Sequence, residues 1–283
     1  MSRIVVDARM AAMSGIGGYI RQVVPRVAAL EPSWRMTLLV QPGSDVSWAG
    51  AANLEPAPCA APVFGVREQW ALAAFARGKH DLFWSTHYNV PLVRRTPLVV
   101  TVLDLAHLRL PEYRSATHRT YARLMFGSVR RSEGVLFDSQ FTRGEFGRLV
   151  GTPRGVTSVV HLGVGSSWRA GDSGNPPGRE PYFVFVGNIK PHKNLPRLLD
   201  ALTIVNRSAS ASLVVIGRMT GLRPVDRDVL AKAEVMGNRV MFLGEADDAS
   251  VRRYVHHAVA LVQPSTYEGF GLPPLEAMQL GVP

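Results

Sequence analysis

Two glutamates near the end of the sequence have the type and the setting to bind hydroxyl groups. Glu268 and Glu276 lie in the segment 264–278, which follows an apolar strand-like run and leads into a helical pattern that opens with Pro274. The glycines of this segment allow close backbone approach, and a proline suits a first helical turn. A carboxylate in that turn is favoured by the helix dipole, so we expect Glu276 to stay ionised and to accept hydrogen bonds from sugar or ribose hydroxyls. Each glutamate taken singly is better explained as ordinary surface charge, but the whole segment indicates an active-site element built from a strand, a loop and a helix.

A second candidate element runs from Val186 to Leu195. Gly187 ends a strand-like run, and Lys193 stands just before the next helical pattern. A lysine beside free backbone N–H groups suits a diphosphate, whose negative charge grows as a bond to it breaks. The alternative is a solvent-exposed lysine at a helix start, because charged side chains are mostly exposed.

A glycine-rich stretch near the N-terminus, 14–19, follows a strand-like run and opens a helix. Gly17 and Gly18 can bring backbone N–H groups close to an anion. The stretch does not satisfy the dinucleotide-binding pattern, because Ile20 occupies the last glycine position and the second strand ends at Gln41 without a ribose-binding acid. The sequence therefore disfavours a nicotinamide-dependent enzyme.

These segments together resemble the retaining GT-B glycosyltransferases of family 4, the group 1 type. The two glutamates with seven residues between them match the glutamate pair of that family, and 186–195 matches its phosphate-binding stretch. Further matching segments are 14–19, 100–105, 138–142 and 161–164. Two positions depart from the common pattern: Asn188 replaces a frequent arginine, for which Lys190 or Arg218 is a candidate substitute, and Leu103 replaces a frequent histidine, for which His87 or His107 is a candidate.

The resemblance implies transfer of a glycosyl unit from a nucleoside diphosphate sugar to an acceptor hydroxyl with retention of configuration. GDP-mannose is the first guess for the donor, a glycan or a lipid-linked saccharide is the expected acceptor, and surface polysaccharide synthesis is the expected setting. It assigns catalytic roles to Glu268, Lys193 and Glu276. It implies neither a cofactor nor a metal. The donor-binding residues that it implies are Gly17, Gly18, Gly187, Asn188, Lys193, Glu268, Gly269, Phe270, Gly271, Leu272 and Glu276.

The elements that must position these residues alternate between short apolar runs and longer helical patterns. This alternation predicts an α/β protein with mostly parallel sheets covered on both faces. We expect two Rossmann-like, doubly wound domains of the GT-B type that face a cleft: an acceptor-side domain at 1–170, a linker at 171–180, and a nucleotide-sugar-binding domain at 181–283. Relatives continue beyond position 283, so the resemblance implies a truncated, incomplete second domain.

Composition limits where the protein can be located and what it can bind. The 283 residues carry a formal charge of +10 and one cysteine, and no apolar run approaches the length of a bilayer span. We therefore expect a cytoplasmic protein without disulfides. Between Arg109 and Arg131 there are six arginines and a single acid. This stretch predicts an amphipathic helix with a solvated basic face; the sharper alternative is a patch that places the protein at the inner face of the cell membrane on anionic lipid.

Three rival functions stay open at this stage. An inactive fragment that binds only nucleotide or anionic membrane fits the early end of the sequence. A GT-B relative with other chemistry, such as a sugar-nucleotide epimerase, should lack the context of the two glutamates. Nucleic-acid binding ranks last, because we find no zinc-ligand spacing, no aromatic and basic interleaving and no helix-turn-helix pattern.

Overall fold

The computed structural model describes residues 1–13, 15–78, 80–113, 115–165, 168, 174, 177, 181–221 and 223–283. The chain divides into two compact units, Met1–Leu162 and Gly163–Pro283. Composition placed the end of the first domain at 170, and the linker expected at 171–180 lies outside the described residues except for Gly174 and Pro177. Each unit has its own parallel sheet and its own hydrophobic clusters, in agreement with the expected α/β class.

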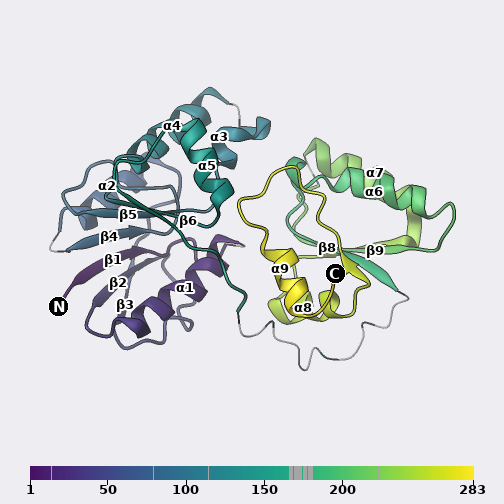
Figure 1. Ribbon diagram of the computed structural model, residues 1–283, viewed down its shortest axis with the longest axis horizontal. Coiled ribbons are helices and arrows are strands. Elements are labelled where there is room, and N and C mark those ends of the chain that lie inside the picture. Colours follow the sequence, from purple (N-terminus) through teal and green to yellow (C-terminus); the bar gives the residue numbers. More distant parts are fainter. Residues whose placement is uncertain are drawn as a thin grey trace. The chain divides into compact units, whose positions relative to one another are not determined.

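Seven parallel strands form the sheet of the first unit, in the order β3-β2-β1-β4-β5-β6-β7 (Figure 1). The chain starts at the centre and winds outward in both directions, so the order reverses between β1 and β4, where ligands of such sheets bind beyond the carboxyl ends of the strands. The strands are β1 (Arg3–Asp7), β2 (Arg35–Val40), β3 (Leu54–Pro58), β4 (Leu82–Ser85), β5 (Leu98–Val102), β6 (Gly134–Phe137) and β7 (Val156–Val159). The helices of this unit are α1 (Ile16–Leu30), α2 (Val66–Ala76), α3 (Ala106–Arg109), the 3₁₀ turn η1 (Pro111–Tyr113), α4 (Ala116–Val129) and α5 (Gln140–Leu149).

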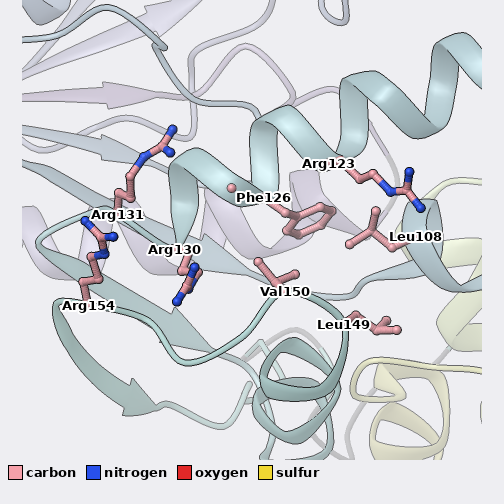
Figure 2. A pocket seen from close by; sticks show the side chains of 9 residues that line it. Leu108, Arg123, Phe126, Arg130, Arg131, Leu149, Val150 and Arg154 are labelled. Atoms are coloured by element: carbon pink, nitrogen blue, oxygen red, sulfur yellow. The ribbon is translucent and has the colours of Figure 1, made fainter.

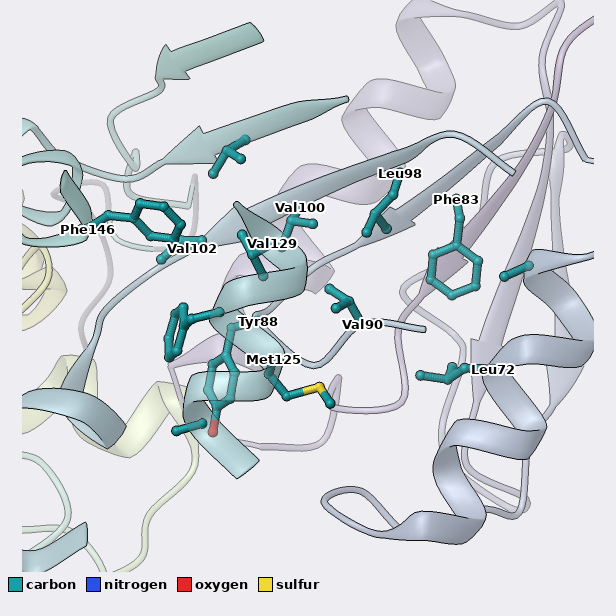
Figure 3. Close-up of a cluster of buried hydrophobic side chains, with 14 of the residues drawn as sticks. Leu72, Phe83, Tyr88, Val90, Leu98, Val100, Val102, Met125, Val129 and Phe146 are labelled. Carbon is teal, nitrogen blue, oxygen red and sulfur yellow. The ribbon is translucent and has the colours of Figure 1, made fainter. Parts of the chain in front are cut away.

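Both faces of this sheet are buried, because neighbouring side chains of a strand point to opposite faces. In β1, Val5 packs into one hydrophobic cluster, whereas Ile4 and Val6 pack into the other. The first cluster is covered by α2, α4 and α5 and the second by α1. Figure 3 shows strand residues of the first cluster, such as Phe83 and Leu98, together with helix residues such as Met125 and Leu72.

The second unit has four parallel strands in the order β10-β9-β8-β11. Its strands are β8 (Tyr182–Val186), β9 (Ser212–Ile216), β10 (Val240–Gly244) and β11 (Ala260–Leu261). One face packs against α6 (Leu195–Val205) and α7 (Pro224–Met236), and the other against α8 (Asp248–His256) and α9 (Leu272–Gln279). Short 3₁₀ turns, η3 (Pro191–Lys193) and η4 (Gly237–Arg239), precede α6 and β10. The alternation of strands and helices expected for this unit is confirmed, and β11 is its shortest described strand.

One strand was missed by the sequence analysis. β3 contains Pro56 and Pro58, which read as breakers because a proline cannot donate to a sheet ladder. The strand lies at the edge of the sheet, where an outward position requires no donor. Its inward bonds come from other positions: Asn53 accepts from the N–H of Met36, and Cys59 donates to Val40.

The arginine-rich stretch forms α3, η1 and α4, and α4 has the expected amphipathic pattern. Arg119 and Arg123 are exposed, whereas Met125 and Val129 are buried. Ser115 begins α4, and its hydroxyl accepts from the N–H of His118 at 3.3 Å. Among the described helices, none has the length and the apolar composition needed to span a membrane.

Candidate functional site

The carboxyl edge of the second sheet is built on two glycines that no other residue could replace without strain. Gly187 follows β8 with φ of 150°, and Gly217 follows β9 with φ of 149°. A Cβ atom on Gly217 would lie 2.1 Å from the carbonyl oxygen of Gly187. The N–H of Gly187 donates to Ile216, and that of Gly217 donates to Gly244, so the strand ends are joined backbone to backbone. The glycines therefore let the loop after β8 lie directly on its neighbour.

Lys193 is placed by the turn η3, which comes directly before α6. Asn194 follows in the left-handed conformation, with φ of 57°, and its amide donates to the carbonyl of Pro264 at 3.1 Å. The N–H of Thr266 donates to the carbonyl of His192 at 2.8 Å. These two bonds join the loop after β8 to the loop after β11, although about 70 residues separate them in the sequence.

The joined loops bring two of the predicted catalytic residues into contact. Lys193 Nζ lies 2.7 Å from Glu268 Oε1, and the side chains are 18% and 28% exposed, respectively. Gln263 Nε2 donates to the same carboxylate oxygen at 2.9 Å. The sequence analysis missed Gln263; its position at the end of an apolar run, beside the glycine-rich loop, is the signal that could have found it. The result is a partly buried ion pair whose cation and anion are both open to a ligand.

The prediction that Glu276 lies in the first helical turn and stays ionised is wrong. α9 begins at Leu272, so its first turn holds Pro273 and Pro274, and Glu276 is the fifth helical residue. Burial and then the nearby negative charge of Asp248 raise the pKa of Glu276 to about 7. The helix dipole lowers the pKa of acidic groups mainly in the first turn, so it does not offset the effect of burial on the pKa of Glu276. Glu276 is therefore poised between its neutral and charged forms near pH 7.

The remaining predicted donor-binding residues of this unit lie along the two joined loops. Gly271 has φ of 99° and caps α9, and Leu272 begins the helix, whereas Gly269 and Phe270 form the partly buried loop before it. Asn188 Oδ1 accepts from the backbone N–H of Arg218 at 3.0 Å. The guanidinium of Arg218, one candidate substitute for the missing arginine, instead pairs with Glu245 at 2.8 Å.

In the first unit, Gly17 and Gly18 lie at the start of α1, as the sequence indicates. The N–H of Gly17 donates to Met13, and a Cβ atom on Gly17 would lie 2.4 Å from the carbonyl oxygen of Ala11. This glycine thus permits tight packing, and its own N–H is already bonded. A Cβ atom on Gly18 would face open space.

A buried polar network below the first sheet's carboxyl edge was not foreseen. Arg9 forms two hydrogen bonds with Asp7, at 2.8 and 2.7 Å, and one with Glu68 at 2.6 Å. The Asn89 amide donates to both oxygens of Glu68. These four side chains are almost fully buried, so each charge depends on its partner. Asp7 and Glu68 are too far apart in the sequence for their spacing to have revealed the network.

The two histidines considered as substitutes at position 103 have different surroundings. His87 is buried, and burial lowers its pKa; its Nε2 lies 3.8 Å from Asp7. His107 Nδ1 lies 2.7 Å from His118 Nε2, and the ring of His107 stacks on Tyr113. Leu103 itself packs against the hydrophobic cluster below α1.

The described part of the chain contains no group of three or more histidine, cysteine, aspartate or glutamate side chains that could hold a metal ion.

The second unit matches a known protein family. Residues 167–283 match the family described as glycosyl transferases group 1. The match covers the second unit, which is therefore similar to the group 1 glycosyl transferases. The joined loops, with Lys193, Glu268 and Glu276, all lie within the matched residues.

Two curated relatives extend the similarity into the first unit. The O-antigen chain mannosyltransferase RfbU of Salmonella typhimurium is 28% identical over 207 residues, which cover 73% of this chain and 56% of the relative. The O-antigen chain mannosyltransferase B of Escherichia coli is 28% identical over 229 residues, which cover 77% of this chain and 58% of the relative. The chain thus spans little more than half the length of the relatives that it matches.

Solved structures of low sequence identity share the fold of this chain. Sucrose-phosphate synthase of Thermosynechococcus elongatus has a TM-score of 0.77 at 19% identity, with 100% of this chain and 80% of that chain covered. Anabaena HepE, solved in complex with UDP-glucose, has a TM-score of 0.73 at 18% identity and covers 100% of this chain and 79% of its own. These structures agree with the expected GT-B fold.

Proposed function

We propose that the chain is a retaining glycosyltransferase that moves a hexose from a nucleoside diphosphate sugar to an acceptor hydroxyl. The observation that carries this proposal is the Lys193–Glu268 pair on the joined loops of the group 1 unit, where one cation and one carboxylate meet at the carboxyl edge of a parallel sheet. Mannose is the proposed sugar and GDP-mannose the proposed donor, supported by the relatives named O-antigen chain mannosyltransferases.

Lys193 is proposed to bind the diphosphate of the donor. When the bond between the sugar C1 and the diphosphate oxygen breaks, the diphosphate keeps the electron pair. The acceptor oxygen forms the new bond to C1, and its proton passes to the departing diphosphate. A positioned lysine stabilises the charge that grows on the leaving group. Because Lys193 is paired with Glu268 in the ligand-free protein, the donor must compete for the ammonium group, which frees the carboxylate.

Glu268 and Glu276 are proposed to hold hydroxyl groups of the donor. Glu268, once released, can accept hydrogen bonds from sugar hydroxyls while the Gln263 amide keeps its orientation. Glu276, whose pKa is raised to about 7, accepts hydrogen bonds from sugar or ribose hydroxyls in its ionised form. Neither carboxylate needs to move a proton in this arrangement.

The acceptor is proposed to be a glycan or a lipid-linked saccharide, bound on the first unit, in the synthesis of a surface polysaccharide. We place this work at the cytoplasmic face of the cell membrane. The names of the O-antigen relatives support the setting. The HepE complex with UDP-glucose supports a nucleotide-sugar donor for a chain of this fold.

The test is donor turnover by the purified chain and two variants. Hydrolysis or transfer would be measured against a panel of nucleotide sugars that includes GDP-mannose and UDP-glucose. We expect Lys193→Ala and Glu276→Ala each to lower kcat by about 100-fold or more, as loss of a group that stabilises the transition state does. Circular dichroism and thermal unfolding would establish that each variant is folded.

Matched substitutions away from the loops serve as controls. Lys232, on α7, pairs with Asp200, and Glu234 is an exposed residue of the same helix, so Lys232→Ala and Glu234→Ala should keep turnover within about twofold. Wild-type turnover in Lys193→Ala or Glu276→Ala would remove that residue from the site. Binding of nucleotide sugar with no turnover by the wild-type chain would favour the alternative of a fragment that only binds nucleotide.

A further inference from the structure

A cavity of about 300 Å³ lies in the first unit, where α4 and α3 meet the end of α5 (Figure 2). Four arginines line it, together with four apolar residues and one glycine of α4. In Figure 2, Arg130, Arg131 and Arg154 gather at one end and Arg123 at the other, with apolar side chains between them. The lining residues are Leu108, Arg123, Phe126, Gly127, Arg130, Arg131, Leu149, Val150 and Arg154.

The charge of this cavity is not balanced by protein carboxylates. No glutamate or aspartate lines it, and none of the ion pairs among the described residues involves any of its four arginines. The nearby acid Glu145 pairs instead with Arg109 and Arg148, which lie outside the cavity. Gathered guanidinium groups repel one another, so this arrangement favours an anion that they can share.

The arginines at the crowded end are held in place by the backbone. Arg130 Nε donates to the carbonyl of Thr152 at 3.1 Å, and the Arg130 side chain packs over Gly151. The N–H of Arg154 donates to the carbonyl of Arg130 at 2.8 Å, and the guanidinium of Arg94 donates to the backbone carbonyl of Arg131. Anchored backbones reduce the entropy that these side chains lose when they bind.

The middle of the cavity is apolar and has room. Phe126 is only 1% exposed and belongs to the core, whereas Leu149 is 44% exposed beside it. Gly127 lies on the same helix, and a Cβ atom there would meet nothing within 4 Å. A simple phosphate would contact only the basic end and leave this apolar surface in water.

We infer that the cavity binds an amphiphilic phosphate, with its phosphate among the arginines and its apolar chain against Leu108, Leu149 and Val150. Guanidinium groups bind phosphate through paired, charge-assisted hydrogen bonds. The apolar chain gains from leaving water. This binding site belongs to the first unit and does not depend on the proposed transfer reaction or on Lys193.

Farnesyl phosphate, used below its micelle concentration, is the probe. Calorimetry at physiological salt would compare it with farnesol and with inorganic phosphate. We expect farnesyl phosphate to bind at least about tenfold tighter than either comparison ligand, because only it fills both parts of the cavity. Flotation with phosphatidylcholine vesicles, with and without phosphatidylglycerol, would establish whether a membrane lipid supplies the phosphate or a single free amphiphile does.

Two independent variants test whether farnesyl phosphate binds in this cavity. The triple variant Arg123→Gln, Arg131→Gln, Arg154→Gln removes charge but keeps Arg130, which holds the backbone. Gly127→Phe fills the space without changing charge, and Gly127→Ala is its matched control. Both cavity variants should weaken farnesyl phosphate binding by about tenfold or more, while a control triple of equal charge, Arg26→Gln, Arg119→Gln, Arg207→Gln, should stay within about twofold of wild type.

These results distinguish binding in the cavity from unspecific binding to the positively charged surface. Loss of binding in both cavity variants, with binding kept in the control triple and in Gly127→Ala, would support the site. Equal loss in the control triple would overturn it in favour of unspecific charge. Wild-type affinity in folded Gly127→Phe, or inorganic phosphate binding as tightly as farnesyl phosphate, would also overturn it. Donor turnover is not used as a readout, so failure here leaves the proposed transferase activity untouched.

Discussion

Glu268 and Gln263 hold the Lys193 side chain in a fixed position on its loop. An unpaired lysine on a loop would sample many rotamers, and fixing it on binding would cost about 1–2 kcal/mol of side-chain entropy. Here Glu268 fixes Nζ at 2.7 Å, and Gln263 fixes Glu268. A partly exposed ion pair adds little net stability of its own. In the proposed reaction, the benefit of this pair is that a ligand with two negative charges can take the place of the Glu268 carboxylate beside Lys193 with little rearrangement of the lysine side chain.

Glu276 allows a residue-scale prediction about pH and stability. Its pKa is raised from 4.5 to about 7 in the folded protein, so the folded state holds this proton more tightly than the unfolded chain does. The free energy of unfolding therefore falls as pH rises from about 4.5 through 7. Above pH 7 the full loss of stability caused by the charged carboxylate is present. Glu276→Gln has no such charge. We expect the variant to be more stable than wild type at pH 8, by roughly 1–2 kcal/mol, and to lose this advantage at pH 4.

Thermal unfolding at pH 8 and pH 4 measures this difference. Glu234→Gln, an exposed acid on α7, is the control and should change stability equally at both pH values. A stability gain for Glu276→Gln that does not depend on pH would contradict a raised pKa. A gain at pH 8 accompanied by loss of turnover is the result that a functional carboxylate gives, because such residues are kept at a cost in stability.

At the scale of elements, two kinds of glycine occur in this fold. Those at the carboxyl edge of the second sheet are required by geometry, as Gly217 shows. Those in the middle of α5 are not: Gly144 and Gly147 are exposed, and a Cβ atom on either would meet nothing. Glycine in a helix interior costs stability because the unfolded chain has more freedom to lose.

Alanine substitutions at these positions should therefore have opposite effects. We expect Gly144→Ala to raise the free energy of unfolding by about 0.5–1 kcal/mol. Gly217→Ala should lower it, by about 2 kcal/mol or more, because the new methyl group collides with the Gly187 carbonyl and the residue has positive φ. Urea unfolding of both variants provides the measurement. A stabilised Gly217→Ala would show that the strand ends are less tightly joined than the structure has them.

At the scale of the molecule, each unit has separate hydrophobic clusters on the two faces of its own sheet. Leu98 is fully buried in a cluster made only of first-unit residues, and the second unit is built on residues such as Phe185 and Leu213. No described cluster contains residues from both units. The units can therefore respond separately to a loss of packing.

Leu98→Ala tests this independence. Removing a buried leucine side chain should cost about 2–5 kcal/mol in the first unit. Hydrogen exchange should then become faster for backbone amides of β4, β5 and β6, whereas exchange in β8 and β9 should stay at the wild-type rate. The reciprocal variant, Phe185→Leu, should affect only the second unit. Equal acceleration in both units after either substitution would mean that the two fold as one cooperative body.

Local pattern was enough to predict the alternation of strands and helices in the described residues. The types and settings of Lys193 and Glu268 also singled out two candidate residues that the structure brings into contact. What could not be predicted depends on distant contacts. The raised pKa of Glu276 depends on the burial of its side chain and on Asp248, and the Arg9 network joins residues about 60 positions apart. Sequence spacing contains no information about such neighbours.

The missed strand β3 has a consequence for behaviour at high concentration. In this edge strand, the backbone groups of Asn53 and Cys59 point inward and bond to β2. Pro56 and Pro58 occupy the other set of positions, whose backbone groups point outward. The rim that faces outward from the sheet therefore lacks two amide donors in a row. A strand from another molecule could not form a continuous ladder with it, so this edge resists intermolecular β-pairing and the polymerisation that follows.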